Sequence, residues 1–413
     1  MTRHIAYLTG QYPRATDTFI QREVAALRAQ GFTVDTATIR ATDAHHHVGP
    51  EQKAEHAATF AVMKSTLNPI RLLAAHFAML RTRPRDWFAT ARLALQTRPP
   101  GIKTTIRQVA YFLEAGVLAH HLRQKGVTHL HNHFADSSCS VAMLMSQMSG
   151  IPYSLTMHGP GIFFEPMHWR IDEKIARAAF VACISHFCRA QGMFFSDPAH
   201  WNRLKIVHCG VDPARYGQDA DRAYAKRVLF VGRLDAVKGV PLLLEAMAAL
   251  REQHPDAVLT VVGDGPHRAR LETQADDLGL AADFVGYKSQ DDVATILAAS
   301  DLLVLPSFAE GVPVVLMEAM AARLPVIASQ VAGVGELVET GVNGFTIPAG
   351  DLDSLIARMD QLLSDPALCA RMGAAGQMRV AEQFDINTEA RWLGELLQAS
   401  LAGTLPKGLG SHC

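Results

Sequence analysis

The residues of this chain best suited to chemistry lie at positions 307–329, in the run SFAEGVPVVLMEAMAARLPVIAS. A strand before this run delivers Glu310 to a loop, and Pro313 stands where the first turn of the next helix tolerates proline. The free amide groups at such a helix start favour an anion, for example a diphosphate. Glu318 lies roughly 6–8 Å further along that helix. We predict that one carboxylate lies beside a sugar at the diphosphate end and that the other reaches ribose hydroxyls.

A second chemical element is VGRLDAVKG at 231–239. It places Arg233 and Lys238 just after a strand and before a helix, where two cations can neutralise a departing diphosphate. Taken alone, such loop cations are usually solvated surface residues. The presence of Glu310 and Glu318 in the same half of the chain favours the catalytic interpretation.

Alternating strands and helices must position these residues. In the first half of the chain, the pattern predicts strands at 5–9 and 32–39 with a helix at 17–30 between them. It then predicts a polar loop at 41–60 and a helical insertion at 61–125. In the second half, strands at 227–233, 257–263, 282–287, 301–307 and 325–329 alternate with helices. We therefore predict an α/β fold of two doubly wound domains, with ligands at the carboxyl ends of their parallel strands.

The predicted domains have the following bounds. The N-terminal, acceptor-side domain covers residues 1–211, and a polar linker follows at 212–225. The C-terminal, nucleotide-sugar-binding domain covers 226–385. A final amphipathic helix at 386–402 is expected to pack back toward the N-terminal domain.

Several runs occur in one order along nearly the whole chain: G-R-L-x-x-x-K-G, G-D-G-P (263–266), ASDLLVLPS (299–307) and E-G-x-P-x-x-x-x-E (310–318). In this order and spacing the chain resembles the retaining glycosyltransferases of family 4. That family has the GT-B fold, in which two Rossmann-like domains face each other across a cleft. The resemblance implies that Arg233 and Lys238 bind the diphosphate and stabilise the leaving group.

The same resemblance implies further donor contacts. Glu310 would contact the hydroxyls of the donor sugar, and Glu318 would bind the ribose. The remaining donor-binding positions flank the nucleotide or offer backbone amides to it: Gly263, Asp264, Tyr287, Gly311 and Val312. His158, in T-M-H-G, matches a cleft histidine that contacts the donor sugar; the alternative is a satisfied core histidine.

The run YPRATDTFIQREVAALRAQGFTV at 12–34 resembles a subgroup that builds exopolysaccharide and lipopolysaccharide. In that subgroup the run is typically Y-P-x-x-S-E-T-F-I-x-x-E. This chain has Thr16-Asp17 where the subgroup has Ser-Glu. Gly10, just before it, would let the chain approach the donor or acceptor. HLHNHFAD at 129–136 also resembles this subgroup, which places His133 near the acceptor.

The alternating histidines His129, His131 and His133 raise the question of a metal site. We predict no metal, because no cysteine, aspartate or glutamate completes the set at metal-like spacing. The resemblance also implies an enzyme that works without a bound metal, and we expect no other cofactor.

Charge is distributed unevenly. Lys and Arg number 39 against 40 Asp and Glu, which argues against a nucleic-acid partner. Yet residues 64–107 carry nine Lys and Arg against Asp86 alone, between apolar and aromatic residues. This pattern is typical of a segment that binds an anionic membrane surface, and the alternative is a solvated helical insertion. Scattered cysteines and the lack of a signal peptide or a membrane-spanning run indicate a cytoplasmic protein at the inner face of the cytoplasmic membrane.

These observations predict a retaining, metal-independent glycosyltransferase. It would move a sugar from a nucleotide-diphosphate sugar to a glycan or lipid-linked acceptor in bacterial exopolysaccharide or lipopolysaccharide biosynthesis. By resemblance, the acceptor hydroxyl attacks the face that the nucleotide leaves, with a diphosphate oxygen helping to remove the proton. The alternatives are a nucleotide-sugar 2-epimerase of the same fold and a non-catalytic nucleotide-sugar-binding partner subunit.

Overall fold

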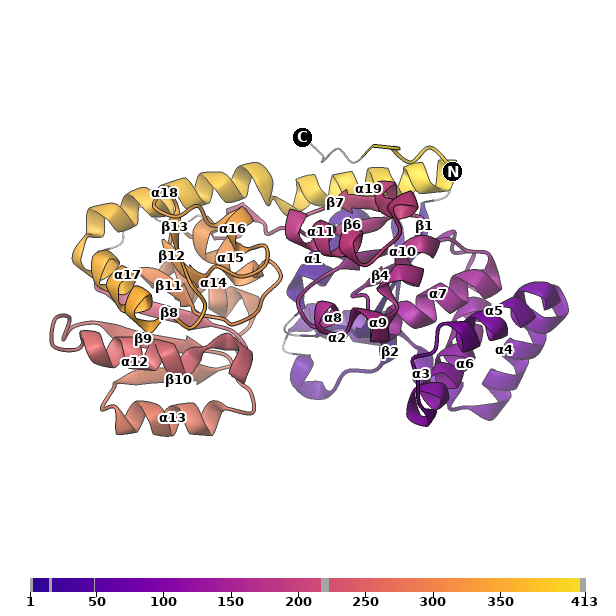
Figure 1. Ribbon diagram of the computed structural model, residues 1–413, viewed down its shortest axis with the longest axis horizontal. Coiled ribbons are helices and arrows are strands. Elements are labelled where there is room, and N and C mark those ends of the chain that lie inside the picture. Colours follow the sequence, from indigo (N-terminus) through magenta and orange to yellow (C-terminus); the bar gives the residue numbers. More distant parts are fainter. Residues whose placement is uncertain (1–2, 15–16, 48, 217–222, 409–413) are drawn as a thin grey trace. The chain divides into compact units, whose positions relative to one another are not determined.

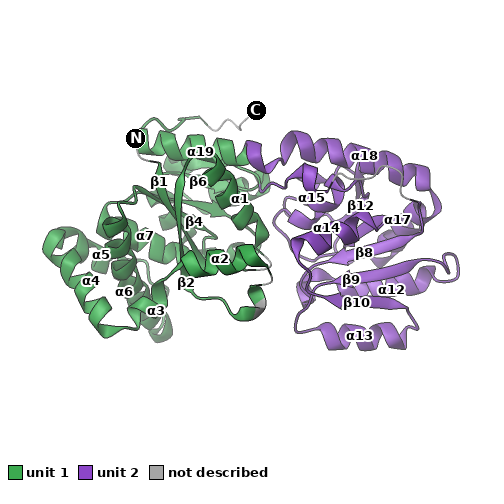
Figure 2. Ribbon diagram, turned by 180° about the vertical axis from the view of Figure 1, so that it is seen from behind, with its two compact units in different colours: residues 1–208, 389–413 green, residues 209–388 purple. Residues whose placement is uncertain are grey.

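The computed structural model describes residues 3–14, 17–47, 49–216 and 223–408 (Figure 1). The chain forms two compact units, which Figure 2 colours separately. Unit 1 comprises residues 1–208 together with 389–413, and unit 2 comprises residues 209–388. Each unit is described by itself below.

Unit 1 is built on a parallel sheet of seven strands in the order β3-β2-β1-β4-β5-β6-β7. Its strands are β1 (His4–Gln11), β2 (Thr33–Arg40), β3 (Phe60–Ala61), β4 (His129–His133), β5 (Tyr153–Met157), β6 (Val181–Cys183) and β7 (Leu204–Ile206). The chain winds from β1 to one edge and from β4 to the other. The topological switch point therefore lies between β1 and β4, where open α/β sheets bind ligands outside the carboxyl ends of the strands.

The helices of unit 1 that lie outside the insertion are α1 (Thr18–Ala29), α2 (Pro50–Ala58), α7 (Ser137–Ser149), α8 (Gly161–Phe164), α9 (Pro166–Trp169), α10 (Ile171–Arg177) and α11 (His186–Phe194), with 3-10 turns at Ala44–His46 and Pro198–Arg203. Helix α2 and strand β3 correct the loop predicted at 41–60. Polar contacts rather than an apolar stripe hold this helix: the Gln52 amide donates to Gln21, and Glu55 pairs with Arg28. Hydrophobic periodicity therefore gave no signal for it.

The insertion at 61–125 is helical, as predicted. It contains α3 (Val62–Thr66), α4 (Pro69–Thr82), α5 (Pro84–Gln96) and α6 (Ile102–Lys125), and α4, α5 and α6 lie at one end of unit 1 (Figure 2). Proline stands at the start of both α4 and α5, where it costs no helical hydrogen bond. Met79 of α4 and Leu93 of α5 are both buried, so each of these helices has an apolar side chain in the interior of the unit.

The C-terminal helix α19 (Ile386–Ala402) completes the core of unit 1. Leu393, Leu396 and Leu397 are fully buried in one cluster with Ile20 and other residues of β1 and α1. The indole Nε1 of Trp392 also donates to the carbonyl oxygen of Ile206, at 2.9 Å.

We expect Leu396→Ala to lower the free energy of unfolding of unit 1 by about 2–5 kcal/mol, because it leaves a cavity in this core. All four tryptophans (87, 169, 201 and 392) lie in unit 1, so tryptophan fluorescence in urea follows that unit. The exposed Gln398→Ala on the same helix is the control. Equal urea midpoints for the two variants would contradict the placement of α19 in the core.

Unit 2 is built on a parallel sheet of six strands in the order β10-β9-β8-β11-β12-β13. The strands are β8 (Arg227–Val231), β9 (Val258–Val262), β10 (Ala282–Gly286), β11 (Leu302–Leu305), β12 (Val326–Ser329) and β13 (Gly344–Ile347). Its helices are α12 (Val240–Leu250), α13 (Arg268–Asp277), α14 (Gln290–Ala298), α15 (Val314–Ala321), α16 (Val334–Leu337), α17 (Leu352–Ser364) and α18 (Pro366–Gln383), with 3-10 turns at Pro213–Arg215 and Ala236–Lys238. The switch point lies between β8 and β11. The predicted α/β class with two Rossmann-like sheets is confirmed.

The region 212–225, expected to be a linker, differs in part from that prediction. Residues 217–222 lie outside the described residues. Tyr216 is only 4% exposed and its hydroxyl donates to Glu318 of α15, so the beginning of this region belongs to unit 2. Among the described residues, no helix combines the length and the apolar character needed to cross a bilayer.

Candidate active site

The switch point of unit 2 holds an ion pair between Lys238 and Glu310. Lys238 follows β8 and Glu310 follows β11, and because these strands are neighbours in the sheet their carboxyl ends meet. The Nζ atom of Lys238 lies 2.6 Å from Oε1 of Glu310. The two side chains are 20% and 10% exposed, so the pair is largely shielded from water yet reachable by a ligand.

Close packing of two loops brings this pair together. The amide of Phe308 donates to the carbonyl of Val237 at 2.7 Å. Gly239 adopts a left-handed φ of 65°, and a Cβ atom there would lie 2.0 Å from the carbonyl oxygen of Pro306. Any other residue at 239 would push the loops apart and separate Lys238 from Glu310.

Positive charge surrounds the same edge. Arg233 is 53% exposed and lies 3.6 Å from the carboxylate of Asp235. Helix α15 begins after Pro313. The amide of Leu316 donates to the carbonyl of Pro313 at 3.1 Å, and the amides of Val314 and Val315 precede any acceptor within the helix and are oriented as donors for an anion. Of the two backbone positions predicted here, Val312 is buried and the carbonyl of Gly311 accepts from the amide of Gly333 at 3.0 Å.

Glu318 lies one turn into α15 and is 8% exposed. Its Oε1 accepts a hydrogen bond from the hydroxyl of Tyr216 at 3.0 Å. The solvated alternative for Glu318 is therefore wrong. Sequence reasoning missed Tyr216, because it lies in a polar run without apolar periodicity.

Residues after β9 and β10 complete this edge of unit 2. Gly263 has a φ of 131°, and a Cβ atom there would lie 1.9 Å from the carbonyl oxygen of Gly232. The carboxylate of Asp264 pairs with Arg268 at 3.1 Å. Tyr287 follows β10 directly and is 44% exposed. The predicted donor-binding residues of unit 2 thus share the carboxyl edge of a single sheet.

The predicted residues of unit 1 also lie at the carboxyl ends of its strands. Gly10 is near the end of β1, His133 ends β4, and His158 follows β5. Nδ1 of His133 and Nε2 of His158 are 3.0 Å apart. The His158 ring contacts Phe19 and Phe134, with ring centroids 5.0 and 4.8 Å away, and burial lowers its pKa well below the usual value. His158 is therefore a neutral imidazole.

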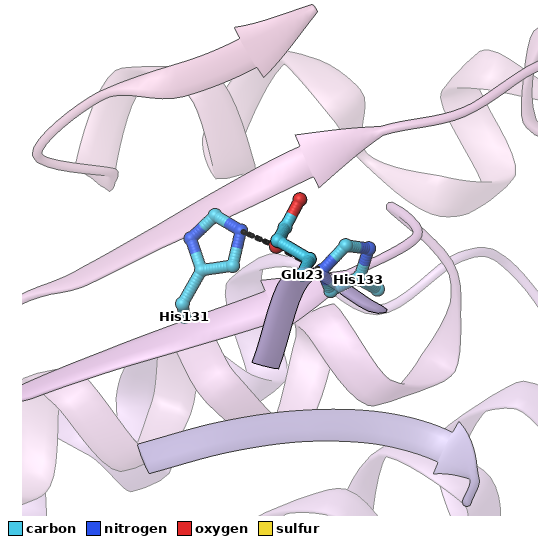
Figure 3. A group of neighbouring side chains, drawn as sticks. All are labelled: Glu23, His131 and His133. Carbon is cyan, nitrogen blue, oxygen red and sulfur yellow. Dashed lines mark hydrogen bonds and ion pairs between the residues drawn. The ribbon is translucent and has the colours of Figure 1, made fainter. Parts of the chain in front are cut away.

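A buried carboxylate, that of Glu23, lies beside His131 and His133 (Figure 3). Oε1 of Glu23, on α1, lies 3.0 Å from Nε2 of His133 and 4.0 Å from Nε2 of His131, and it accepts from the Tyr7 hydroxyl at 2.6 Å. Glu23 thus adds a carboxylate to the histidine set, contrary to the sequence-based prediction, because the fold brings it from 110 residues away. A signal for it exists: Glu23 is the last residue of the Y-P-x-x-S-E-T-F-I-x-x-E pattern.

Glu23, His131 and His133 have an arrangement that could hold a metal ion. Their atoms are nevertheless engaged within the protein, because Nε2 of His131 also bonds the hydroxyl of Thr156 at 2.8 Å. Burial lowers the pKa of His131 to about 3. Burial opposes ionisation of Glu23, but the neighbouring His133 outweighs it and the pKa of Glu23 falls to about 2. The cluster is therefore a closed hydrogen-bond network around one carboxylate.

An open pocket adjoins Gly10 at the switch point of unit 1. Glu114 of α6 and Arg40 of β2 line it, together with Tyr111 and Asp136. Glu114 is 7% exposed, and its Oε2 has no hydrogen-bond partner among the described residues. Burial raises the pKa of Glu114 to about 7, against the opposing charge of Arg40. The insertion thus supplies this pocket with a carboxyl group that titrates near neutrality.

This shift predicts a pH-dependent stability. The pKa of Glu114 is about 7 in the folded protein and 4.5 ordinarily, so between pH 4.5 and pH 7 the folded state binds more protons than the unfolded state. The free energy of unfolding therefore falls as the pH rises through this range. Glu114→Gln should match the wild type near pH 4–5 and exceed it by about 2–3 kcal/mol at pH 8. Urea unfolding followed by tryptophan fluorescence at both pH values measures this. If Glu114→Gln and the wild type differed in free energy of unfolding by the same amount at both pH values, the raised pKa of Glu114 would be contradicted.

Comparison with known proteins agrees with this geometry. Residues 220–379, most of unit 2, match the family model of the glycosyl transferases group 1. The amylovoran biosynthesis glycosyltransferase AmsK of Erwinia amylovora is 32% identical over 206 residues, which cover 48% of this chain and 51% of that protein. A putative colanic acid biosynthesis glycosyltransferase, WcaL of Salmonella typhimurium, is 23% identical across 95% of this chain and 99% of its own length.

Solved structures share the fold across the whole chain. Sucrose-phosphate synthase from Thermosynechococcus elongatus has a TM-score of 0.74 at 23% identity, covering 97% of this chain and 99% of its own. HepE from Anabaena, solved in complex with UDP-glucose, has a TM-score of 0.71 at 19% identity, covering 96% and 99%. The GT-B fold class is thereby confirmed.

The chain carries a glycosyl transferases group 1 domain, and the recognition of this group from the motifs is confirmed. The matched segments span about half the length of the first curated relatives, AmsK and a glycogen synthase of Mycobacterium tuberculosis.

Proposed function

We propose that this chain is a retaining glycosyltransferase that transfers a sugar from a nucleotide-diphosphate sugar to a bacterial surface glycan or its lipid carrier. The observation that carries this proposal is the Lys238–Glu310 pair at the switch point of unit 2, beside the start of α15. A cation, a carboxylate and free helix amides at one edge suit a diphosphate joined to a sugar. The complex of HepE with UDP-glucose supports a donor of this class.

In this proposal, Arg233, Lys238 and the first amides of α15 hold the diphosphate and stabilise the charge that develops as it leaves. Glu310 accepts hydrogen bonds from sugar hydroxyls. Glu318 accepts from the ribose hydroxyls and exchanges its bond to Tyr216 for them. The remaining nucleotide contacts come from the loops after β9 and β10, at Gly263, Asp264 and Tyr287. His158 of unit 1 contacts the donor sugar, as the resemblance implies.

The reaction would break the bond between the anomeric carbon and the diphosphate oxygen and form a bond from that carbon to the acceptor oxygen on the same face. The acceptor proton passes to an oxygen of the leaving diphosphate. Because two cations and the helix amides supply positive charge, we propose that no metal is needed. Retention of the anomeric configuration follows from attack on the face that the nucleotide leaves.

The acceptor is proposed to bind unit 1 in the pocket beside Gly10. Carboxyl groups of Glu114 and Asp136 and the guanidinium of Arg40 suit the hydroxyls of a glycan. The amylovoran and colanic acid relatives support an exopolysaccharide as the product. Lipopolysaccharide is the alternative product for an acceptor of this class.

The insertion is proposed to dock on an anionic membrane at the cytoplasmic face. Its basic residues apart from Arg83 are exposed, and so are apolar side chains that follow one stripe of each helix: Ile70, Leu73 and Phe77 on α4, Phe88 and Leu95 on α5, and Ile102, Ile106 and Val109 on α6. Exposed apolar stripes flanked by arginine suit a bilayer interface rather than water. A membrane position would bring the enzyme to a lipid-linked acceptor.

A thermal-shift screen with UDP-, GDP- and ADP-sugars tests the donor. A true donor at 100 times its Kd should stabilise the protein by about 2.7 kcal/mol through mass action. Each stabilising nucleotide sugar is then incubated with and without acceptor. Formation of an epimer without acceptor would identify a 2-epimerase, and binding without any turnover would identify a non-catalytic partner subunit.

A further inference from the structure

A carboxyl group on α6 faces the pocket beside Gly10 without a partner of its own. Glu114 lines this pocket and is 7% exposed. Its Oε2 is shielded from water, and no residue in the described part of the chain bonds it. Burying a polar group without a hydrogen bond is costly, so folded proteins pair nearly all such groups. The missing partner of Glu114 is therefore expected to come from a bound molecule.

The same pocket holds a hydrogen-bond donor in the same condition. Nε of Arg14 is buried, and it too makes no hydrogen bond to a described residue. Arg14 and Glu114 both line the pocket, which has a volume of about 310 Å³. A sugar suits such a lining, because each of its hydroxyls both donates and accepts hydrogen bonds.

Two other carboxylates of the lining already have partners inside the protein. Oδ2 of Asp17 lies 3.6 Å from Nη1 of Arg14. Oδ1 of Asp136 accepts from the amide of Ser138 at 2.9 Å and so caps the start of α7. Glu114 differs from both, since nothing in the described ranges satisfies its Oε2.

Arg40 and Tyr111 are the other ionisable groups that line the pocket with Glu114. Arg40 ends β2, and its positive charge opposes the effect of burial on the Glu114 carboxyl. Tyr111 lies one turn earlier on α6, and burial raises the pKa of its hydroxyl. Tyr111 is therefore neutral near pH 7, and Arg40 favours the ionised form of Glu114.

We propose that Glu114 is a specificity-determining residue of the acceptor site, where its ionised carboxylate accepts a hydrogen bond from a hydroxyl of the acceptor sugar and so couples acceptor binding to release of a proton. The identity of this ligand as the acceptor rests on the proposed function. In the empty pocket, burial raises the pKa of Glu114 to about 7, and much of it is protonated at neutral pH. A hydrogen bond from the ligand favours the charged form, lowers that pKa and releases the proton.

The direction of this hydrogen bond follows from its strength. A protonated Glu114 that donated to the sugar would keep its proton when the acceptor binds. A hydrogen bond to an ionised carboxylate is about twice as strong as one between neutral groups. Arg40 stabilises the same ionised form, so the acceptor binds preferentially to ionised Glu114.

Acceptor affinity should therefore rise with pH. With a pKa of about 7, roughly one tenth of Glu114 is ionised at pH 6 and roughly nine tenths at pH 8. The apparent Kd is the intrinsic Kd divided by this fraction, so it should fall roughly tenfold between the two pH values. Glu114→Gln has no ionisable group at this position and should bind the acceptor equally well at both.

The direct test is ¹³C NMR of the Glu114 carboxyl in the full chain, labelled at glutamate Cδ and assigned with Glu114→Gln. The pH is titrated alone and with the methyl glycosides of glucose, galactose, mannose and glucuronic acid. We expect a Glu114 pKa of about 7 in the protein alone and a clearly lower pKa with a glycoside that binds. A pKa that no glycoside lowers would overturn the proposal, and it is also the result expected if an ordered water satisfies Oε2. An ordinary carboxyl pKa in the protein alone would overturn it as well.

Deoxy analogues of the glycoside that binds then identify the hydroxyl. The analogue without the hydroxyl that bonds Glu114 should bind at least roughly tenfold more weakly and leave the pKa of Glu114 unchanged. If every deoxy analogue lowered this pKa as much as the parent glycoside, no single hydroxyl would bond Glu114, and the assignment of specificity would be overturned.

Kinetics distinguish this inference from the proposed function. With an active donor and acceptor, the KM for the acceptor should fall roughly tenfold from pH 6 to pH 8 in the wild type and stay constant in Glu114→Gln. Glu395→Gln removes an exposed carboxylate on α19 of the same unit and should behave as the wild type. A pH-dependent KM that Glu114→Gln retains would overturn the inference and leave the proposed function standing. If no sugar is transferred, the proposed function fails, while the NMR titration still decides whether a sugar hydroxyl bonds Glu114.

Discussion

Replacing Lys238 by alanine is expected to lower kcat by roughly 100- to 1,000-fold, the effect of removing one preorganised charge from a leaving-group site. The change also leaves Glu310 largely buried without its ion-pair partner, which should destabilise unit 2 by about 1–3 kcal/mol. Steady-state turnover measures the first effect. Hydrogen exchange of the β8 and β11 amides measures the second, because unit 2 contains no tryptophan.

The double variant Lys238→Ala/Glu310→Ala separates the two effects. It removes both charges, so it should recover most of the lost stability while remaining as inactive as the single variant. Lys226→Ala is the control, because it breaks a surface pair with Asp256 (2.7 Å) next to the opposite end of β8. Turnover by Lys238→Ala within about threefold of wild type would refute the assigned role of this pair.

The double variant Ile70→Asp/Phe77→Asp is expected to lose binding to vesicles that contain anionic lipid. Each apolar side chain contributes about 1.5–3 kcal/mol when fully buried, so the partition coefficient should fall at least roughly 100-fold. Stability should change little, because the two residues are 78% and 67% exposed. Vesicle flotation with neutral and anionic lipid measures the effect.

Met378→Asp controls for the general loss of an exposed apolar residue, since Met378 is 61% exposed on α18 of unit 2. Arg71→Glu/Arg81→Glu should weaken binding by about 1 kcal/mol or more per residue, and only at low salt. Equal flotation of the wild type with neutral and anionic vesicles would show that the insertion is a solvated structural element.

Most of the strands and helices could be predicted from the sequence, because strands buried on both faces and helices with a regular apolar stripe have strong periodic patterns. It also predicted that the proposed donor-binding residues of unit 2 lie near the carboxyl ends of parallel strands, which is where the structure has them. It missed α2, which polar contacts hold, and assigned no elements beyond residue 329 in unit 2. Tyr216 lies in a polar run, and its burial could not be predicted because it depends on tertiary packing.

Pairing between distant residues was beyond sequence reasoning. Lys238 and Glu310 are 72 residues apart, and both were read as separate ligand contacts rather than as an ion pair. Glu23 and His133 are 110 residues apart, and the sequence analysis interpreted the histidines without the carboxylate that lies 3.0 Å from His133. Neighbouring parallel strands bring Lys238 and Glu310 together at one edge of a sheet. The crossover helix α1 brings Glu23 beside the end of β4.

Transfer of a labelled sugar, from the nucleotide sugar that stabilises the protein to a lipid-linked glycan acceptor, tests the proposed function most directly. We predict that label enters the organic-extractable glycan with the anomeric configuration of the donor, in amounts equal to the nucleoside diphosphate released, and that Lys238→Ala lowers the rate of both roughly 100- to 1,000-fold. Label that appears only as free sugar or as an epimeric nucleotide sugar would contradict it.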